Sequence, residues 1–207
     1  GYVAKKMGLP IERLVIATNE NDILARSLAS GRYELRGVKA TQSPSMDIQV
    51  SSNFERLLFD AHGRDAGAVR SLMARLDQGG AFDIGATPLA AIRADFDAES
   101  VTEQETAAEI ARVYRQDDHI LDPHSAVGVA AGVRALAKHN HTPMIVAGTA
   151  HPAKFPDAIA AATGVRPALP PHLADIMERK ERFDVVENDM KAVENFIRAR
   201  ARAAVGA

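Results

Sequence analysis

The sequence predicts an α/β fold, because short apolar runs alternate along the chain with longer segments of helical periodicity. The runs Leu-Val-Ile-Ala at 14–17 and Met-Ile-Val-Ala at 144–147 are each typical of a buried strand. Elsewhere apolar residues recur three and four positions apart, as they do at Val69, Leu72 and Leu76. Buried strands of this kind need helices on both faces, so we expect a three-layer arrangement, a sheet with flanking helices.

Two helix starts are marked by capping residues. Thr102 and Glu105 have the spacing of a capping box, and Asp122 precedes Pro123, a residue suited to the first helical position. The expected helices cover, in chain order, residues 2–7, the segment from 23, two segments within 51–77, then 102–115, 123–138 and 186–197. We therefore expect residues 46–100 to be a peripheral helical insertion and residues 183–207 to be a C-terminal helix.

The first helix has no residue that caps its start. Tyr2, Val3 and Met7 share one helical face, and Gly8 with Pro10 forms a stop signal. A helix that starts without a cap predicts an upstream part of the polypeptide. A processed terminus is the other explanation of the same pattern.

Composition excludes several classes of protein. The 207 residues are 46% hydrophobic and 25% charged with a formal net charge of -2, which fits neither a disordered chain nor a nucleic-acid binder. The absence of cysteine excludes disulfides, thiolate zinc sites and cysteine nucleophiles. No apolar run approaches the length of a membrane helix, so we expect no membrane partner and a cytoplasmic location. His139 and His141 have no carboxylate at ligand spacing, and we predict no metal site.

Three polar clusters lie where a sheet of this kind binds ligands. Residues 18–22 and 148–151 follow the two strand runs, and residues 122–125 open a helix. Ligands of open α/β sheets lie beyond the carboxyl ends of strands, and helix N-termini favour anions. Each cluster also fits a local role, as a helix cap or a polar turn.

Read together, these clusters resemble the threonine synthase family, whose members depend on pyridoxal phosphate and have fold type II, the tryptophan-synthase β-like fold. Six strings occur in family order over nearly the whole chain: GYVAKKMGLP at 1–10, ATNENDIL at 17–24, SPSMDI at 43–48, SSNFERLL at 51–58, LDPHSAVG at 121–128 and TAHPAKF at 149–155. The resemblance covers only the C-terminal portion of the family, so we expect residues 1–207 to form that portion of the catalytic domain, incomplete at its N-terminal side.

The resemblance implies a substrate, a cofactor and a reaction. The substrate is expected to be O-phospho-L-homoserine, and pyridoxal 5'-phosphate is the expected electron sink for proton loss at Cα and Cβ. Phosphate leaves from Cγ and water adds at Cβ, which gives L-threonine. A site for this chemistry must hold a phosphate dianion and a carboxylate among convergent hydrogen-bond donors and cations.

The resemblance also assigns residues to the site. Thr149 is expected to face the pyridine nitrogen of the cofactor, and Asn19 and Asn21 are expected to bind cofactor. The residues expected at the substrate are Ser51, Ser52, Asn53, Arg56, His124, Ser125, His151 and Lys154.

No catalytic residue is assigned, because the Schiff-base lysine of the family lies upstream of the matching region. Lys5 and Lys6 match the helix after the cofactor-phosphate loop. We therefore expect the chain alone to be inactive, with the upstream part of the polypeptide as its partner. Two alternatives stay open, another fold-type II lyase (a threonine dehydratase or a phospholyase) and a non-catalytic paralogue.

Overall fold

The structure, a computed structural model, describes residues 1–138 and 142–201. The chain divides into two compact units, Gly1–Ala168 and Leu169–Ala207. His139 and His141, for which no metal role was predicted, lie outside the described residues, as does the end of the predicted C-terminal helix from 202 onwards. None of the described helices is both long enough and apolar enough to span a bilayer.

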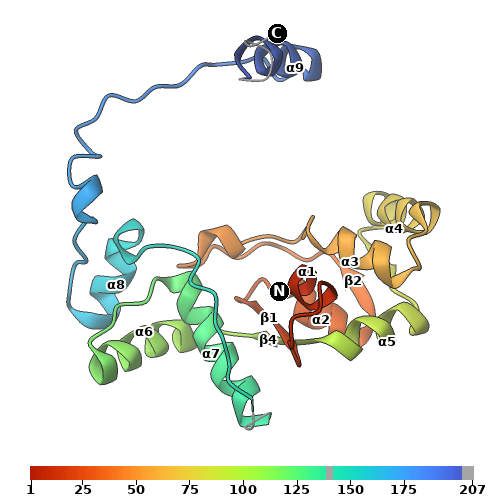
Figure 1. Ribbon diagram of the computed structural model, residues 1–207, viewed down its shortest axis with the longest axis horizontal. Coiled ribbons are helices and arrows are strands. Elements are labelled where there is room, and N and C mark those ends of the chain that lie inside the picture. The colour runs from red at the N-terminus through yellow and green to blue at the C-terminus, as the bar shows by residue number, and fades with distance from the viewer. Residues whose placement is uncertain (139–141, 202–207) are drawn as a thin grey trace. The chain divides into compact units, whose positions relative to one another are not determined.

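The first unit contains two small sheets. Strand β1 (Leu14–Thr18) pairs in parallel with β4 (Phe96–Ser100), so that Leu14 lies opposite Phe96 and Thr18 opposite Ser100 (Figure 1). Strands β2 (Arg32–Glu34) and β3 (Ala81–Asp83) form an antiparallel pair. A parallel pair with helices between its strands confirms the α/β class.

Helices make up most of the rest of this unit. They are α1 (Tyr2–Lys6), α2 (Ile23–Ser30), α3 (Phe54–Ala61), α4 (Ala66–Gly79), α5 (Ala86–Asp95), α6 (Glu103–Asp117), α7 (Pro123–Lys138) and α8 (Pro156–Thr163), with 3-10 turns η1 (Pro44–Met46) and η2 (Pro152–Lys154). Both α2 and α7 pack against β1. The largest core cluster surrounds Tyr33, whose ring stacks on Phe82 with centroids 4.9 Å apart and lies 5.8 Å from Phe54.

Residues 46–100, which we predicted to be a peripheral helical insertion, contain strands as well as helices. Helices α3, α4 and α5 lie there, but the segment also supplies β3 and β4, and β4 is the partner of β1. Strand β4 reads Phe-Asp-Ala-Glu-Ser and has no apolar run. Its charged side chains are paired with residues from other elements, Asp97 with Arg13 and Glu99 with Lys138. Because these partners are distant in the sequence, the local pattern does not reveal the strand.

The second predicted strand, 144–147, has no strand partner among the described residues. Its side chains nevertheless alternate, with Met144 and Val146 half-buried and Ile145 exposed. A Cβ built on either Gly128 or Gly132 of α7 would lie 3.0 Å from a methyl of Val146. The segment therefore packs on α7 in the manner of a strand without belonging to a sheet.

The second unit contains η3 (Pro171–Leu173) and α9 (Met190–Arg200). The helix predicted over 183–207 begins later than expected, at Met190. Asp189 sets this start, because its carboxylate accepts a hydrogen bond from the Ala192 amide at 2.9 Å.

The predicted capping box is present at the start of α6 and also joins α6 to α7. Thr102 Oγ1 accepts from the Glu105 amide, while the Glu105 carboxylate accepts from the Thr102 amide at 2.8 Å. The same carboxylate accepts from the Arg134 guanidinium of α7. The bond from the Thr102 backbone and the bond from Arg134 lower the pKa of the Glu105 carboxyl to about 2.

We predict that Thr102→Ala lowers the free energy of unfolding by about 1 kcal/mol, because it removes the N-cap acceptor of α6. The measurement is urea denaturation at pH 7. Thr87→Ala is the matched control, since Thr87 is an exposed threonine in the first turn of α5 whose side chain has no hydrogen bond to another described residue. Equal effects of the two substitutions would contradict the capping role.

The charge of Glu105 gives a second prediction. Its pKa is below the ordinary value of 4.5, so its charge stabilises the fold above pH 4.5 and this stabilisation disappears as the pH falls toward 2. Glu105→Gln keeps a capping oxygen and removes the charge, and we expect it to cost less than about 1 kcal/mol at pH 7 because the ion pair is exposed. Urea denaturation between pH 7 and pH 2 should show the difference from wild type shrinking. A difference that is constant with pH would refute the prediction.

Candidate functional site

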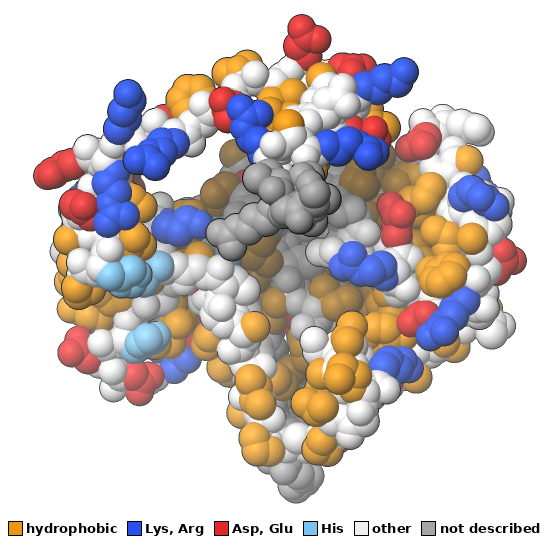
Figure 2. All heavy atoms as spheres, turned by 45° about the horizontal axis from the view of Figure 1, so that its top comes forward, with side chains coloured by type: hydrophobic (Ala, Val, Ile, Leu, Met, Phe, Trp, Pro, Cys, Tyr) orange, Lys and Arg blue, Asp and Glu red, His pale blue; other side chains and the backbone are white. Residues whose placement is uncertain are grey.

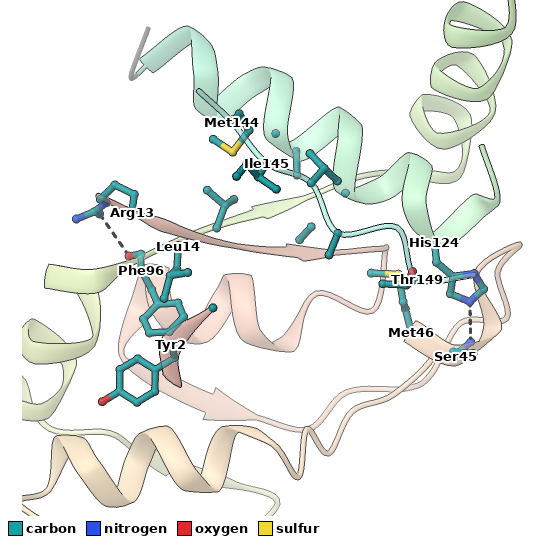
Figure 3. A pocket seen from close by; sticks show the side chains of 18 residues that line it. Tyr2, Arg13, Leu14, Ser45, Met46, Phe96, His124, Met144, Ile145 and Thr149 are labelled. Carbon is teal, nitrogen blue, oxygen red and sulfur yellow. Dashed lines mark hydrogen bonds between the residues drawn. The ribbon is translucent and has the colours of Figure 1, made fainter. Parts of the chain in front are cut away.

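A cavity of about 580 Å³ lies beside β1 and is lined by Leu14, Val15 and Ala17 of this strand and by Phe96 at the start of β4. Strand β1, the segment 144–147 and helix α7 all contribute to its walls, and most lining side chains are apolar. Figure 3 shows the two ends of the cavity. Tyr2, Arg13 and Phe96 lie at one end, and Ser45, Met46, His124 and Thr149 gather at the other.

The second end is the polar one, and it lies at the carboxyl end of β1. Three separate stretches of sequence meet there: the turn η1, the start of α7 and the residues after 144–147. This is the position at which open α/β sheets bind their ligands. His124 and Thr149, which the sequence predicts for the site, both lie at this end of the cavity.

The start of α7 is built around the Asp122 carboxylate, which is 1% exposed. One of its oxygens accepts from the His124 amide at 2.9 Å, from His124 Nδ1 at 3.0 Å and from the Ser125 amide at 3.4 Å. His124 Nε2 in turn accepts from the Ser45 amide at 3.3 Å. Both ring nitrogens of His124 are therefore in use, and they link α7 to the loop that carries Ser45. The imidazole also lies against Phe155, with ring centroids 4.8 Å apart.

Thr149 is held at the same point through its backbone. Its amide donates to Ser125 Oγ at 3.2 Å. No hydrogen bond of the Thr149 hydroxyl to another described residue is found, and the residue is exposed. The predicted pair Ser125 and Thr149 is thus brought together, with the Thr149 hydroxyl available to a ligand.

Asn19 and Asn21, the predicted cofactor ligands, lie beyond the end of β1 and are buried at 0% and 3% exposure. Their amide groups both donate to Asp47 Oδ1, at 2.8 and 2.9 Å. Asn19 Nδ2 is also within 2.8 Å of Thr41 Oγ1, and the Asn21 side chain bonds the backbone of Lys39 in both directions. The two side chains therefore bind the loop over 39–47.

Asp47 is the common acceptor in this network. Besides the two asparagines, it accepts from the Thr41 hydroxyl at 2.6 Å and from the Thr41 amide at 2.8 Å. Burial raises the pKa of the Asp47 carboxyl, but the hydrogen bonds from Thr41 and Asn19 lower it by more. The net pKa lies below the ordinary value of 3.8, so Asp47 is ionised at neutral pH.

The remaining predicted substrate residues do not line this cavity. His151 is exposed, and its Nδ1 accepts from the Ala153 amide at 3.1 Å, which caps η2. Lys154 is exposed, with its ammonium 5.8 Å from the centre of the Phe155 ring.

The residues predicted at the start of α3, Ser51, Ser52, Asn53 and Arg56, also lie outside the lining of this cavity. Arg56 and Asn53 are both exposed and bond one another at 2.5 Å, and Ser52 is exposed too. The Ser51 amide donates to the Tyr33 hydroxyl at 2.8 Å. Ser51 lines a smaller neighbouring cavity of about 170 Å³, together with Asn21, Ser45 and Met46.

Residue-by-residue prediction missed the loop residues that organise the site: Thr41, Ser45, Met46 and Asp47. The sequence contains a signal for three of them, since Ser45, Met46 and Asp47 lie within the string SPSMDI at 43–48, which is part of the family resemblance. Their roles depend on partners that are distant in the sequence. Within residues 1–138 and 142–201, no three His, Asp or Glu side chains are arranged to hold a metal ion.

Comparison with known proteins agrees with this geometry. The family profile "Threonine synthase, C-terminal" matches residues 125–197. The threonine synthase of Pseudomonas aeruginosa is 46% identical over 95% of this chain, and that of Saccharomyces cerevisiae is 42% identical over the same share. A crystal structure of PLP-bound threonine synthase from Brucella melitensis superposes with a TM-score of 0.82, at 58% identity over 98% of this chain, and the yeast enzyme also scores 0.82.

These matches define the class first: the chain has the α/β architecture of fold type II, with its polar site at the carboxyl end of β1. Its sequence is that of the C-terminal portion of the threonine synthase family. The chain spans about two fifths of its relatives, 42% of the Pseudomonas protein and 43% of the Brucella chain.

We predict that Asp47→Ala lowers the free energy of unfolding by about 3 kcal/mol, because it leaves the amides of Asn19 and Asn21 and the Thr41 donors without their charged acceptor. Urea denaturation at pH 7 measures the loss. Asp77→Ala, at an exposed position of α4, is the matched control and should change stability by less than about 0.5 kcal/mol. A loss at Asp47 no larger than at Asp77 would disprove the role of this network.

Proposed function

We propose that this chain is the part of a threonine synthase that supplies one wall of its active site. The reaction is the conversion of O-phospho-L-homoserine and water to L-threonine and phosphate, a lyase reaction dependent on pyridoxal 5'-phosphate. The observation that carries the proposal is the Thr149 hydroxyl, which lies at the polar end of the cavity without a partner among the described residues. The names of the relatives, which match 95% of the chain, support the same activity.

The residues at this end of the cavity fit one edge of the cofactor. When bound, pyridoxal phosphate supplies the electron sink that makes the substrate Cα and Cβ protons acidic. Thr149 would offer a neutral hydroxyl to the pyridine nitrogen, and a neutral partner would leave that nitrogen largely unprotonated. Ser125 holds the Thr149 amide, and His124 and Asp47 hold the loop at Ser45. These residues orient the wall of the site.

The structure changes the role that we propose for the two asparagines. Asn19 and Asn21 have their amide groups engaged by Asp47 and the 39–47 loop. We propose that they position this loop, and that any contact with cofactor or substrate runs through the loop residues they hold.

The substrate phosphate needs cations to bind it, and Lys154 and Arg56 remain the predicted cations. Ser51, Ser52 and Asn53 remain the predicted hydrogen-bond donors. Both cations are exposed, and neither lines the cavity at Thr149. His151 and Ser125 are predicted near the same anion. These assignments rest on the family resemblance.

We propose that the reactive lysine is supplied by another part of a longer polypeptide. Lys5 and Lys6 of this chain form ion pairs with Asp95, at 3.0 and 3.3 Å, and Lys5 also donates to the Glu12 carbonyl. Both ammonium groups are thus engaged away from Thr149. The length of the relatives leaves room for such a part. A cytoplasmic location stays a prediction.

The test uses the longer polypeptide that contains this chain. Borohydride reduction followed by peptide mapping should place a pyridoxyl group on a lysine outside residues 1–207, and the purified protein should release phosphate from O-phospho-L-homoserine. A pyridoxyl group on Lys5, Lys6 or Lys154 would overturn the assignment. Ammonia release from threonine without phosphate release from phosphohomoserine would instead favour a dehydratase.

We predict that Thr149→Val lowers kcat/KM for phosphate release on the order of ten- to hundredfold, which is the effect of losing one hydrogen bond to a reacting ligand. Thr149→Ser keeps the hydroxyl and should retain most activity. The cofactor absorbance of both variants reports whether the ring environment changed. Equal losses in the two variants would show that the hydroxyl is not the operative group.

A further inference from the structure

We propose that His124 positions the loop at Ser45 only while its imidazole is neutral, and that Asp122 selects the tautomer in which it does so. Protonation of His124 then releases Ser45 from α7. This inference deepens the proposed function and rests on it for the effect on catalysis, whereas the hydrogen bonds themselves belong to the described residues.

The two ring nitrogens of His124 face groups of opposite kind. Nδ1 lies 3.0 Å from Asp122 Oδ1, which also accepts from the amides of His124 and Ser125 and therefore faces the ring as an acceptor. Nε2 lies 3.3 Å from the Ser45 amide, which can only donate, and Figure 3 shows this bond as a dashed line. A neutral imidazole has one donor and one acceptor nitrogen. The arrangement therefore requires a hydrogen on Nδ1 and none on Nε2.

A second proton on His124 reverses the contact at Nε2. In the imidazolium ion both ring nitrogens are donors, so Nε2–H would point at the Ser45 N–H, and two donors cannot form a hydrogen bond. The contact at Nδ1 would meanwhile become a charge-assisted bond to Asp122, which is stronger than the neutral one. Protonation therefore keeps the ring in place on α7 and frees the loop alone.

Ser45 is exposed, whereas the side chain of His124 is only 7% exposed. Once freed, the Ser45 amide can donate to water, so loss of its bond to His124 costs only the modest net free energy of one hydrogen bond. The bound and released states of the loop therefore differ little in free energy. This small difference is the condition under which one proton selects between two states.

The charged groups around the ring come from three elements. Asp122 lies at the start of α7, and Asp47 of the loop is close enough to His124 for their charges to interact. Lys154 of η2 lies 5.8 Å from the centre of the Phe155 ring, which packs on the imidazole. On the face shown in Figure 2, Lys and Arg side chains are interspersed with Asp and Glu side chains. Because distant exposed charges are also screened by salt, the three nearby groups are the ones that act on the ring.

The Ser45–His124 bond and the Asp47 network respond to different pH ranges. Histidine is the side chain whose ordinary charge change falls between pH 5 and pH 8. Burial raises the pKa of the Asp47 carboxyl, and hydrogen bonds from Thr41 and Asn19 lower it by more, to below the ordinary value of 3.8. Asp47 therefore keeps its charge and its donors while the pH falls through the titration of His124, and only Ser45 is released.

This assignment makes His124 a positioning residue instead of the substrate ligand that the family resemblance implies. Both of its ring nitrogens are occupied, so none is free to bind a substrate anion. Ser45 and Met46 line the polar end of the cavity with Thr149. Release of Ser45 therefore loosens part of the wall at Thr149, and under the proposed function it should lower kcat/KM for phosphate release.

NMR of the longer polypeptide that contains this chain, labelled with 15N-histidine, tests the tautomer directly. The signals of His124 are assigned by their loss in His124→Gln. At pH 8 we expect a hydrogen on Nδ1 and none on Nε2, and as the pH falls to 5 we expect Nε2 to gain a proton. A hydrogen on Nε2 at pH 8, or no change of charge between pH 8 and pH 5, overturns the proposal.

Hydrogen exchange measured by mass spectrometry tests the release of the loop in the same protein. After correction for the intrinsic pH dependence of exchange, the amides of 43–47 should exchange on the order of three- to tenfold faster when His124 is charged, the effect of losing one hydrogen bond. The midpoint of this change should coincide with the NMR titration of His124, and the β2–β3 pair serves as internal reference. Corrected exchange of 43–47 that does not depend on pH overturns the proposal.

His124→Gln separates the charge from the hydrogen bond. A glutamine oxygen can accept from the Ser45 amide but takes up no proton in this range, so 43–47 should keep one corrected exchange rate between pH 5 and pH 8. His119→Gln is the matched control, since His119 is exposed beyond the end of α6 and its side chain has no hydrogen bond to another described residue. It should keep the wild-type response. Loss of the response in both variants, or in neither, overturns the proposal, and the two wild-type measurements decide it if His124→Gln does not fold.

Failure of this inference and failure of the proposed function are separable. Phosphate release from O-phospho-L-homoserine by a protein whose 43–47 amides exchange independently of pH refutes the role of His124 alone. Exchange of 43–47 that follows the titration of His124, without phosphate release and without a pyridoxyl lysine, refutes the proposed activity and leaves the role of His124 in place.

Discussion

The ionised carboxylate of Asp47 is the interaction on which the candidate site depends. It gathers donors from the end of β1, Asn19 and Asn21, and from the loop residue Thr41. Asp47 is partly buried, and these donors compensate the desolvation of its carboxylate and lower its pKa. The network therefore fixes the 39–47 loop against the carboxyl end of β1.

A second hydrogen bond connects this loop to α7. The Ser45 amide donates to His124, and His124 is oriented by Asp122 at the start of the helix. Ser125, the next residue, holds the amide of Thr149. Three segments that are remote in the chain thus converge on one end of the cavity. Each bond is modest alone, and together they present the Thr149 hydroxyl in one place.

Local features of the fold were predictable because their causes are local. The capping box at Thr102, the Asp122 cap and the amphipathic helices each depend on residues within four positions of one another. Strand β4 was missed, since its charged residues are tolerated only through partners such as Arg13, 84 residues away from Asp97. The 144–147 run was predicted as a strand on good grounds, but it has no described partner in this chain.

By itself the sequence determined the α/β class, the positions of most helices and the family through its six strings, and it predicted Thr149 and His124, which line one cavity, for the same site. Only the tertiary structure decided what the polar residues do. It showed that Asn19 and Asn21 bind a loop through Asp47, that His124 uses both ring nitrogens, and that Lys154 lies outside the cavity. The physical reason is the separation along the sequence between the residues that interact. Periodicity and capping act within one or two helical turns, whereas Asp47 is 28 residues from Asn19 and 26 from Asn21, and Ser45 is 79 residues from His124.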